Sequence, residues 1–352
     1  MSAILLKGSS EKAFCAGGDV RSLASHTGSA AEREAAATHF FRVEDALVYR
    51  IATMHKPHIA VIDGIVMGGG AGVSINGAFR VATERSLFAM PECVIGFFPD
   101  VGATHFLNRL PGQLGMCCAL TGMRLRGQDL LRTGLATHFV PSDLLPRVMQ
   151  RLADLGQYAR DHAVVDTALR EFEPPGLGLA APPADSILHQ LPHINAWFGH
   201  DTVEAIDAAL AHAAQPATDA GSEDAVAALA ASLLKELRRG SPLSLKVGLE
   251  AMRRHRNATL RSCLLTEFRL VKRFMAPDSD FYEGVTAQLI TKTGKPAWRP
   301  ASLADVTPDM VAAFFEPLPP GQELELPVER EGLKPQKEGE TGRRSKQARS
   351  KL

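Results

Sequence analysis

Three short segments combine glycines and acidic residues in a pattern that favours chemistry at a carbonyl group. They are residues 13–19 (AFCAGGD), 64–72 (GIVMGGGAG) and 88–102 (FAMPECVIGFFPDVG). Attack on a carbonyl such as that of a thioester puts negative charge on its oxygen, and losing one backbone N–H that stabilises this charge typically costs about 3–4 kcal/mol. Glycine lets a ligand approach the backbone because it has no Cβ. The first two segments could therefore each supply one N–H donor.

Each glycine segment also has a purely structural interpretation. The Gly-Gly-Asp sequence at 17–19 is, by itself, typical of a turn, and the glycine triplet at 68–70 would also permit tight packing. A phosphate-binding P-loop requires Lys and Ser or Thr after its glycines, whereas Ala71 and Gly72 follow here. The glycine spacing matches a dinucleotide-binding fingerprint only in part. From these residues alone, an oxyanion-stabilising site and a structural turn both stay open.

Short strands and helices must position these segments. Apolar runs predict strands at 3–6, 58–62, 79–82 and 86–89. Helical spacing of apolar residues predicts helices at 38–54 and, after the glycine triplet, at about 71–76. Strand, glycine turn, helix and strand in succession predict an α/β core.

The second half of the sequence has a different character. Helical patterns dominate from about Leu144, as at 225–239 and 260–275, and low-complexity loops interrupt them at 174–183 and 213–224. We therefore divide the chain into a core with the active site at 1–143 and a helical region at 144–315. Residues 316–352 are proline-rich, charged and free of aromatic side chains, which predicts a disordered tail.

Composition argues against several classes of protein. The chain has 352 residues with 39 Lys plus Arg and 39 Asp plus Glu, so its net charge favours neither nucleic acid nor a membrane surface as a partner. The five cysteines lack C-x-x-C spacing, which predicts free thiols and no zinc site. The longest apolar stretch, 59–79, contains Asp63, Asn76 and several glycines, and therefore predicts a strand and a turn rather than a membrane span.

In this order, the three segments together resemble the crotonase superfamily. The matching motifs are AFCAGGD, MGGGAG, and MPE followed by IGFFPDVG. The resemblance implies a core of ββα units in a spiral, an acyl-CoA substrate, no metal or other cofactor, and assembly as a homo-oligomer, usually in trimers or their multiples. It also implies that the backbone N–H groups of Gly18 and Gly69 form the oxyanion hole. Members begin upstream with a further strand and helix, so we expect the first segment of the spiral to be missing here.

The acidic residues point to one branch of this superfamily. Hydratases carry a glutamate two residues after the glycine triplet, where this chain has Gly72, and another at the position of Glu92. The pair Glu92 and Asp100 resembles the 3-hydroxyisobutyryl-CoA hydrolases, and this likeness extends over about residues 3–315. It implies hydrolysis of 3-hydroxyisobutyryl-CoA, or a similar short 3-hydroxyacyl-CoA, in valine catabolism.

The resemblance also implies roles for individual residues. Glu92 would activate a water or attack the thioester itself, and Asp100 would orient the substrate hydroxyl or share in proton transfer. Glu44 would hold the acyl part, so that Glu44, Gly69, Glu92 and Asp100 together contact the substrate. Two alternatives stay open. Dienoyl-CoA isomerases share the spacing of the two acids, and some homologues are catalytically silent proteins of mitochondrial ribosomes.

The last three residues carry a targeting pattern. Ser350-Lys351-Leu352 is the tripeptide that the peroxisomal import receptor binds, and basic residues precede it. It predicts localisation in the peroxisome or the related glycosome, with the import receptor as a partner. The mitochondrion, where many proteins with this resemblance reside, is the alternative.

Overall fold

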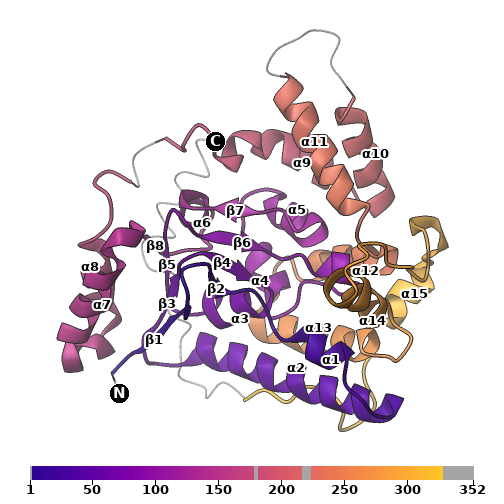
Figure 1. Ribbon diagram of the computed structural model, residues 1–352, viewed down its shortest axis with the longest axis horizontal. Helices are drawn as coiled ribbons and strands as arrows, with labels where there is room; N and C mark the ends of the chain where they lie inside the picture. The colour runs from indigo at the N-terminus through magenta and orange to yellow at the C-terminus, as the bar shows by residue number, and fades with distance from the viewer. Residues whose placement is uncertain (1, 178–180, 216–222, 328–352) are drawn as a thin grey trace.

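The structure is a computed structural model that describes residues 2–177, 181–215 and 223–327 (Figure 1). Its core repeats one pattern, in which the chain passes through one sheet, then through a second sheet, and then into a helix or helical turn. The first repeat is β1 (Ile4–Lys7), β2 (Ala13–Cys15), α1 (Val20–Ala24) and α2 (Ala30–Thr53). The second is β3 (His58–Ile62), β4 (Ile65–Met67) and α3 (Gly69–Ile75). The third is β5 (Phe79–Ala82), β6 (Leu87–Ala89) and the 3₁₀ helix η1 (Glu92–Ile95).

Two sheets result from this spiral in the described part of the chain. One has the order β1-β3-β5-β8 with parallel neighbours, and β8 spans His138–Phe139. The other has the order β2-β4-β6-β7, where β7 (Leu125–Arg126) runs antiparallel to β6. Parallel neighbours require crossover connections, and each crossover here passes through the other sheet. The α/β ββα spiral and the strands predicted from apolar runs are confirmed.

Two helices begin earlier than the apolar pattern predicts. Helix α2 starts at Ala30 rather than near residue 38, because Ser29 and Glu32 form a capping box in which each side chain accepts the backbone N–H of the other. Helix α3 starts at Gly69 rather than at residue 71, because Gly68 takes the N-cap position at φ +51°. The N–H of Gly69 therefore belongs to the first helical turn, where N–H groups have no acceptor within the helix.

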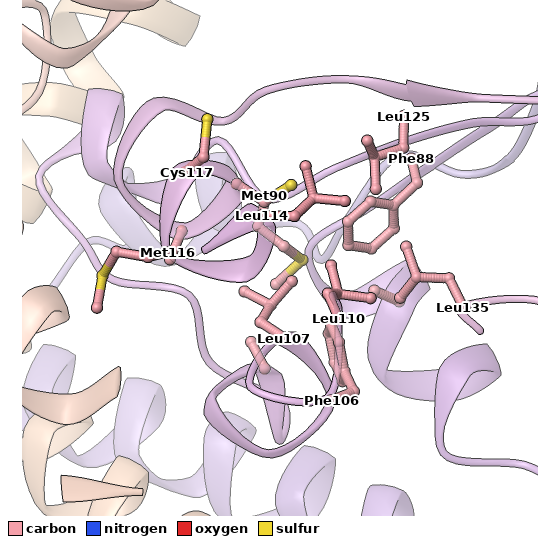
Figure 2. Close-up of a cluster of buried hydrophobic side chains, with 14 of the residues drawn as sticks. Phe88, Met90, Phe106, Leu107, Leu110, Leu114, Met116, Cys117, Leu125 and Leu135 are labelled. Carbon is pink, nitrogen blue, oxygen red and sulfur yellow. The ribbon is translucent and has the colours of Figure 1, made fainter. Parts of the chain in front are cut away.

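The main core lies between the second sheet and helices α4 (Ala103–Leu107) and α5 (Leu114–Thr121) (Figure 2). Phe88, Leu107 and Leu114 are almost entirely buried there, and burying such a side chain contributes about 1.5–3 kcal/mol. Met90 and Cys93 belong to the same cluster. Because these two residues flank Glu92, hydrophobic packing determines where the η1 turn and its glutamate lie.

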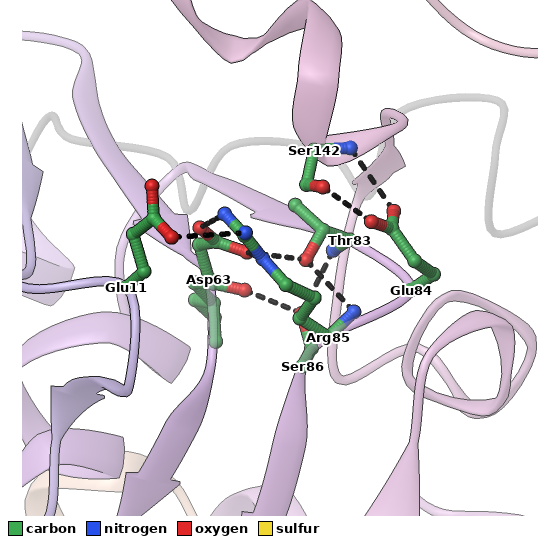
Figure 3. Close-up of polar contacts among 8 residues, drawn as sticks. Glu11, Asp63, Thr83, Glu84, Arg85, Ser86 and Ser142 are labelled. Atoms are coloured by element: carbon green, nitrogen blue, oxygen red, sulfur yellow. Dashed lines mark hydrogen bonds and ion pairs between the residues drawn. The ribbon is translucent and has the colours of Figure 1, made fainter.

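A polar network closes the turn between the two sheets (Figure 3). Asp63, just after β3, accepts hydrogen bonds from Thr83 Oγ1 at 2.7 Å and from Arg85 Nε at 2.9 Å. The hydroxyl of Ser86 accepts the Thr83 N–H at 2.7 Å and donates to the carbonyl of Ile62. The ends of β3 and β5 are thus tied together at the point where the chain leaves β5 for β6.

Helices surround this core. Helices α7 (Leu145–Asp154) and α8 (His162–Arg170) pack against the face of the first sheet. Helices α10 (Val203–Ala213) and α11 (Glu223–Leu237) project from one end of the molecule, and α13 (Leu260–Phe274) lies along α2 (Figure 1). The remaining elements are α6 (Gln128–Thr133), η2 (Ser142–Leu144), η3 (Gly156–Arg160), η4 (Ile187–Gln190), α9 (Leu191–Phe198), α12 (Pro242–Arg254), α14 (Asp280–Val285), the π-helix η5 (Thr286–Ile290), η6 (Leu303–Asp305) and α15 (Pro308–Ala313). The predicted boundary at 143/144 falls in η2. No described helix has the length and apolarity needed to cross a membrane.

The predicted disordered tail at 316–352 is wrong for its first part. Leu324 and Leu326 are buried in the main core at 3% and 6% exposure, and Glu323 accepts a hydrogen bond from Arg269 Nε at 2.9 Å. Two alternating leucines and an ion pair are among the contacts that pack residues 316–327 onto the helices, although the average composition of this segment is that of a disordered one. Residues 328–352, including Ser350-Lys351-Leu352, lie outside the described residues.

Candidate active site

The two glycine turns meet beside two glutamates. A Cβ placed on Gly69 would lie 2.5 Å from Glu44 Oε1 and 3.3 Å from the backbone nitrogen of Gly18. A Cβ placed on Gly68 would lie 3.1 Å from Glu92 Oε1. The side chains of Glu44, from α2, and Glu92, from η1, therefore approach the same stretch of glycine backbone. Only residues without a side chain leave room there for a ligand carbonyl.

Asp100 completes an acidic cluster with these glutamates. It lies in the loop between η1 and α4 and is 6% exposed, as is Glu92. Burial is the main cause that raises the pKa of Asp100 well above its usual range, and the charges of Glu44 and Glu92 raise it further. The structure thus brings together Gly18, Glu44, Gly69, Glu92 and Asp100, the residues that the sequence analysis predicts for the site. Their individual roles stay predictions.

Burial disfavours the ionised form of both glutamates. It raises the pKa of Glu92 to about 8, and the charge of Glu44 contributes to this increase. It also raises the pKa of Glu44 to about 7. Glu92 Oε2 has no hydrogen-bond partner among the described residues. A carboxyl group with a raised pKa and an unpaired oxygen beside a ligand-accessible backbone has the properties of a general base or nucleophile.

Position 72 has no room for a side chain. A Cβ on Gly72 would lie 2.7 Å from Val101 Cβ and 3.1 Å from Val48 Cγ2. Val101 itself has φ +54°, which is a genuine outlier for a β-branched residue. The space that a glutamate two residues after the glycine triplet would need is therefore filled by Val101. The sequence shows the missing glutamate, but only the structure shows what replaces it.

Two further acids in this region were missed by the sequence analysis. Asp45, next to Glu44 on α2, is 3% exposed, and Glu267 on α13 is fully buried. The charges of both contribute to the raised pKa of Asp100. A signal for Glu267 did exist. It shares the apolar face of α13 with buried Cys263, Leu264, Phe268 and Val271, where a glutamate needs a specific partner. In the described part of the chain, no group of three or more His, Cys, Asp or Glu residues is arranged to hold a metal ion.

The ββα spiral, with two glycine turns that meet beside buried carboxyl groups, defines an α/β protein with a buried acidic site. The chain belongs to the enoyl-CoA hydratase/isomerase family, whose profile matches residues 1–315. The crystal structure of a carnitinyl-CoA dehydratase from Mycobacterium thermoresistibile superimposes with a TM-score of 0.78 at 36% identity, covering 92% of this chain and 85% of that one.

Curated relatives carry the names of a hydrolase and of a ribosomal protein. The chain is 41% identical over 322 residues to the mitochondrial 3-hydroxyisobutyryl-CoA hydrolase of Mus musculus, covering 90% of this chain and 77% of the relative. It is 38% identical over 321 residues to the small ribosomal subunit protein mS47 of Arabidopsis thaliana, covering 90% of this chain and 74% of the relative. The resemblance to 3-hydroxyisobutyryl-CoA hydrolases is thus confirmed. The mitochondrial label of the mouse relative supports the alternative localisation and not the peroxisomal prediction.

Proposed function

We propose that the protein hydrolyses 3-hydroxyisobutyryl-CoA, or a similar short 3-hydroxyacyl-CoA, to the free acid and CoA. The observation that carries this proposal is the buried Glu92 carboxyl beside the Gly68–Gly69 turn, combined with a position 72 that has no room for a second glutamate. Glu92 Oε1 lies beside Gly68, whereas Glu44 Oε1 lies beside Gly69, so the two acids approach the glycine turn at neighbouring residues. The similarity to hydrolases at about 40% identity supports the same substrate class.

In the proposed reaction, the carbonyl oxygen of the thioester accepts hydrogen bonds from the backbone N–H groups of Gly18 and Gly69. Ionised Glu92 takes a proton from water as the water oxygen bonds to the carbonyl carbon, and the negative charge develops on the thioester oxygen. Collapse of this intermediate breaks the C–S bond, and the leaving thiolate takes the proton back from Glu92. In the alternative route, Glu92 attacks the carbonyl carbon, expels the thiolate and forms an anhydride that water opens.

Asp100 and Glu44 would act on the acyl part of the substrate. Burial and neighbouring charges raise the pKa of Asp100 well above its usual range, which favours the protonated carboxyl, the form that can donate a hydrogen bond. We assign it to the substrate hydroxyl, with a share in proton transfer. Glu44, which lies against Gly69, would contact the acyl chain. The CoA is part of the substrate, and no further cofactor is invoked.

A panel of thioesters tests the proposal. Release of free thiol from 3-hydroxyisobutyryl-CoA is expected, together with no hydration of crotonyl-CoA and no isomerisation of a dienoyl-CoA. Hydration of crotonyl-CoA without hydrolysis of the first substrate would contradict the proposal, and dienoyl-CoA turnover would favour the isomerase alternative. A role in valine catabolism further predicts that loss of the gene causes 3-hydroxyisobutyryl-CoA to accumulate on valine as carbon source.

The similarity to mS47 favours one second candidate, a catalytically silent protein of the mitochondrial ribosome. The retention of Glu92 and Asp100 in a buried site supports the hydrolase instead. Sedimentation of a cell extract separates the two candidates. A hydrolase is expected in fractions of its own size, or of a small homo-oligomer, whereas a ribosomal protein sediments with the ribosomal subunit.

The proposed localisation is the peroxisome or glycosome, which the protein would enter through the import receptor that binds Ser350-Lys351-Leu352. The test is a fluorescent protein that carries residues 340–352 at its C-terminus, compared with a version that lacks Leu352. Punctate signal that disappears without Leu352 supports the proposal. Mitochondrial signal from the full-length protein, with or without Leu352, would instead establish the mitochondrial localisation that the names of its relatives give.

A further inference from the structure

The loop that carries Asp100 is held on both sides by the C-terminal helices. On the side before Asp100, the rings of Phe97 and Phe98 lie 5.6 Å and 5.4 Å from the ring of Phe274 at the end of α13, and Phe97 lies 5.5 Å from Phe281 on α14. Aromatic pairs at such distances are favourable packing contacts. This side of the loop is therefore fixed by a hydrophobic cluster.

On the side after Asp100, the loop is fixed by one buried carboxylate. The N–H of Gly102 donates to Glu267 Oε2 at 2.7 Å, and the N–H of Thr104 donates to Oε1 at 3.1 Å. The hydroxyl of Thr104 donates to the same Oε1, and His255 Nδ1 lies 2.8 Å from that hydroxyl. Both oxygens of Glu267 are thus used by backbone or side-chain donors of the segment that follows Asp100.

The backbone between Asp100 and this anchor is strained. Val101 has φ +54° and Gly102 has φ +79°, so two consecutive residues lie in the left-handed region. Such a conformation persists only when surrounding contacts determine it, and it is frequent at functional sites. Asn76 Nδ2 holds the Val101 carbonyl at 3.2 Å, and Glu267 holds the next N–H. Removing either contact would allow the turn to relax, and the Asp100 side chain would then move with its backbone.

We propose that Glu267 is a positioning residue for Asp100. By accepting the N–H of Gly102 and both donors of Thr104, it keeps the left-handed turn at 101–102 in place and holds the Asp100 carboxyl beside Glu44 and Glu92. The helical region thereby contributes to catalysis without contacting the substrate. The catalytic part of this inference rests on the proposed function. The anchoring part rests on the hydrogen bonds alone.

The position of Glu267 in its helix supports a specific purpose. It is fully buried on the otherwise apolar face of α13, where an apolar side chain would pack without the cost of removing a carboxyl group from water. A buried carboxylate is tolerated only where hydrogen bonds compensate for the lost water. The donors to Glu267 described above, Gly102 and Thr104, both belong to the segment after Asp100, so the benefit of the acid is concentrated on that loop.

The test compares Glu267→Gln with a matched control, Asp129→Asn. Gln keeps the shape, but its NH₂ group cannot accept an N–H, so one of the two anchored amides loses its acceptor. Asp129 lies on α6, which packs against β5, β7 and β8. It is also buried and also accepts one hydroxyl and one backbone N–H, from Ser186 and Ile187. Both variants are expected to lower Tm. Only Glu267→Gln should lower kcat for 3-hydroxyisobutyryl-CoA, by at least about tenfold, because misplacement of a catalytic group reduces turnover.

A double-mutant cycle then separates positioning from general damage. If Glu267 acts through Asp100, Glu267→Gln should reduce kcat much less in an Asp100→Asn background than in the wild type. The same reduction factor in both backgrounds, or an unchanged kcat in a folded Glu267→Gln protein, overturns the inference.

Amide hydrogen exchange tests the anchor without any turnover. Glu267→Gln should accelerate exchange at Gly102 or at Thr104, whichever amide then faces the NH₂ group, and Asp129→Asn should accelerate neither. Unchanged exchange at both amides overturns the inference. Accelerated exchange in a chain that hydrolyses no thioester would instead place the failure in the proposed function, while the anchor itself stands.

Discussion

Glu92 is surrounded by groups that oppose its ionisation. Burial raises its pKa to about 8, and the charge of Glu44 adds to this effect. Asp100, which interacts with both glutamates, has a raised pKa for the same reasons. Acids placed together in this way titrate over a wide range of pH. The pH dependence of both activity and stability therefore reports directly on the proposed site.

The first prediction concerns the rate as a function of pH. As base or nucleophile, Glu92 must be ionised, so kcat/KM should rise about tenfold per pH unit below its pKa of about 8 and then level off. Because the Glu44 charge raises that pKa, Glu44→Gln should move the rise to lower pH, whatever its effect on the plateau. A rate that is independent of pH between 5 and about 8 would remove Glu92 from the reaction.

The second prediction concerns stability as a function of pH. An acid whose pKa is raised by folding contributes its full share of stability below the unfolded pKa of about 4.3, and loses it as pH rises toward the folded pKa of about 8. In that window, one such acid lowers the free energy of unfolding by up to about 1.4 kcal/mol for each unit of pH. Glu92→Gln should therefore have a Tm that exceeds that of the wild type by a margin that grows from pH 5 to pH 8. The exposed Glu325→Gln is the control, and an equal slope for both variants would contradict the burial of the Glu92 charge.

At the scale of the elements, helix α3 and the turn at Val101 interlock. The side chain of Val101, whose backbone is left-handed, packs directly against the backbone of Gly72. Helix α3 has room only for a glycine at position 72, which excludes a glutamate there. Of the two glutamate positions of the hydratase pattern, only Glu92 is then occupied by an acid. This arrangement is a physical reason why the chain follows the hydrolase pattern of acids rather than the hydratase pattern.

The third prediction tests this interlock. Gly72→Ala should lower stability by about 1–3 kcal/mol, because a Cβ at 2.7 Å from Val101 Cβ forces the packing apart. Gly248→Ala in α12 is a matched control, since its Cβ would meet Leu120 Cδ2 at an ordinary 3.8 Å. Urea unfolding of the two variants measures the difference. A Gly72→Ala protein as stable as the control would show that position 72 has room after all.

How well the elements could be predicted depended on what determines them. Buried strands such as 58–62 were found because burial enforces an apolar run. The start of α2 was missed because it depends on polar capping by Ser29 and Glu32 rather than on apolar periodicity. Within the site, Glu92 and Asp100 lie in a recognisable stretch of sequence. Glu267 does not lie in such a stretch. It comes close to Asp100 because α13 packs beside α2, and these two helices are separated by more than half of the sequence.

At the scale of the whole molecule, the core and the helical region share one hydrophobic interior. The main cluster contains Phe88 from the sheets, Phe268 from α13 and Leu324 from the segment after α15. The segment at 316–327 also contacts α2, where Arg42 donates to the Glu323 carbonyl at 2.8 Å. Composition could not predict this, because the average over residues 316–352 conceals two well-placed leucines.

The fourth prediction concerns this segment. Leu324→Ala should lower the free energy of unfolding by about 2–5 kcal/mol, the usual cost of truncating a buried leucine. Glu325→Ala, which changes an exposed neighbour, should be close to neutral. Both values come from urea denaturation of the full-length protein. If the two variants are equally stable, residues 316–327 do not pack as described.

The most direct test of the central claim is the release of CoA thiol from 3-hydroxyisobutyryl-CoA by wild type and by Glu92→Gln in parallel. Gln has the shape of Glu but is neither a base nor a nucleophile at neutral pH. The account predicts turnover by the wild type, a kcat lower by at least about a hundredfold for Glu92→Gln, and a folded variant with no loss of Tm. Near-normal turnover by Glu92→Gln, or no thiol release by a folded wild-type protein, would contradict it.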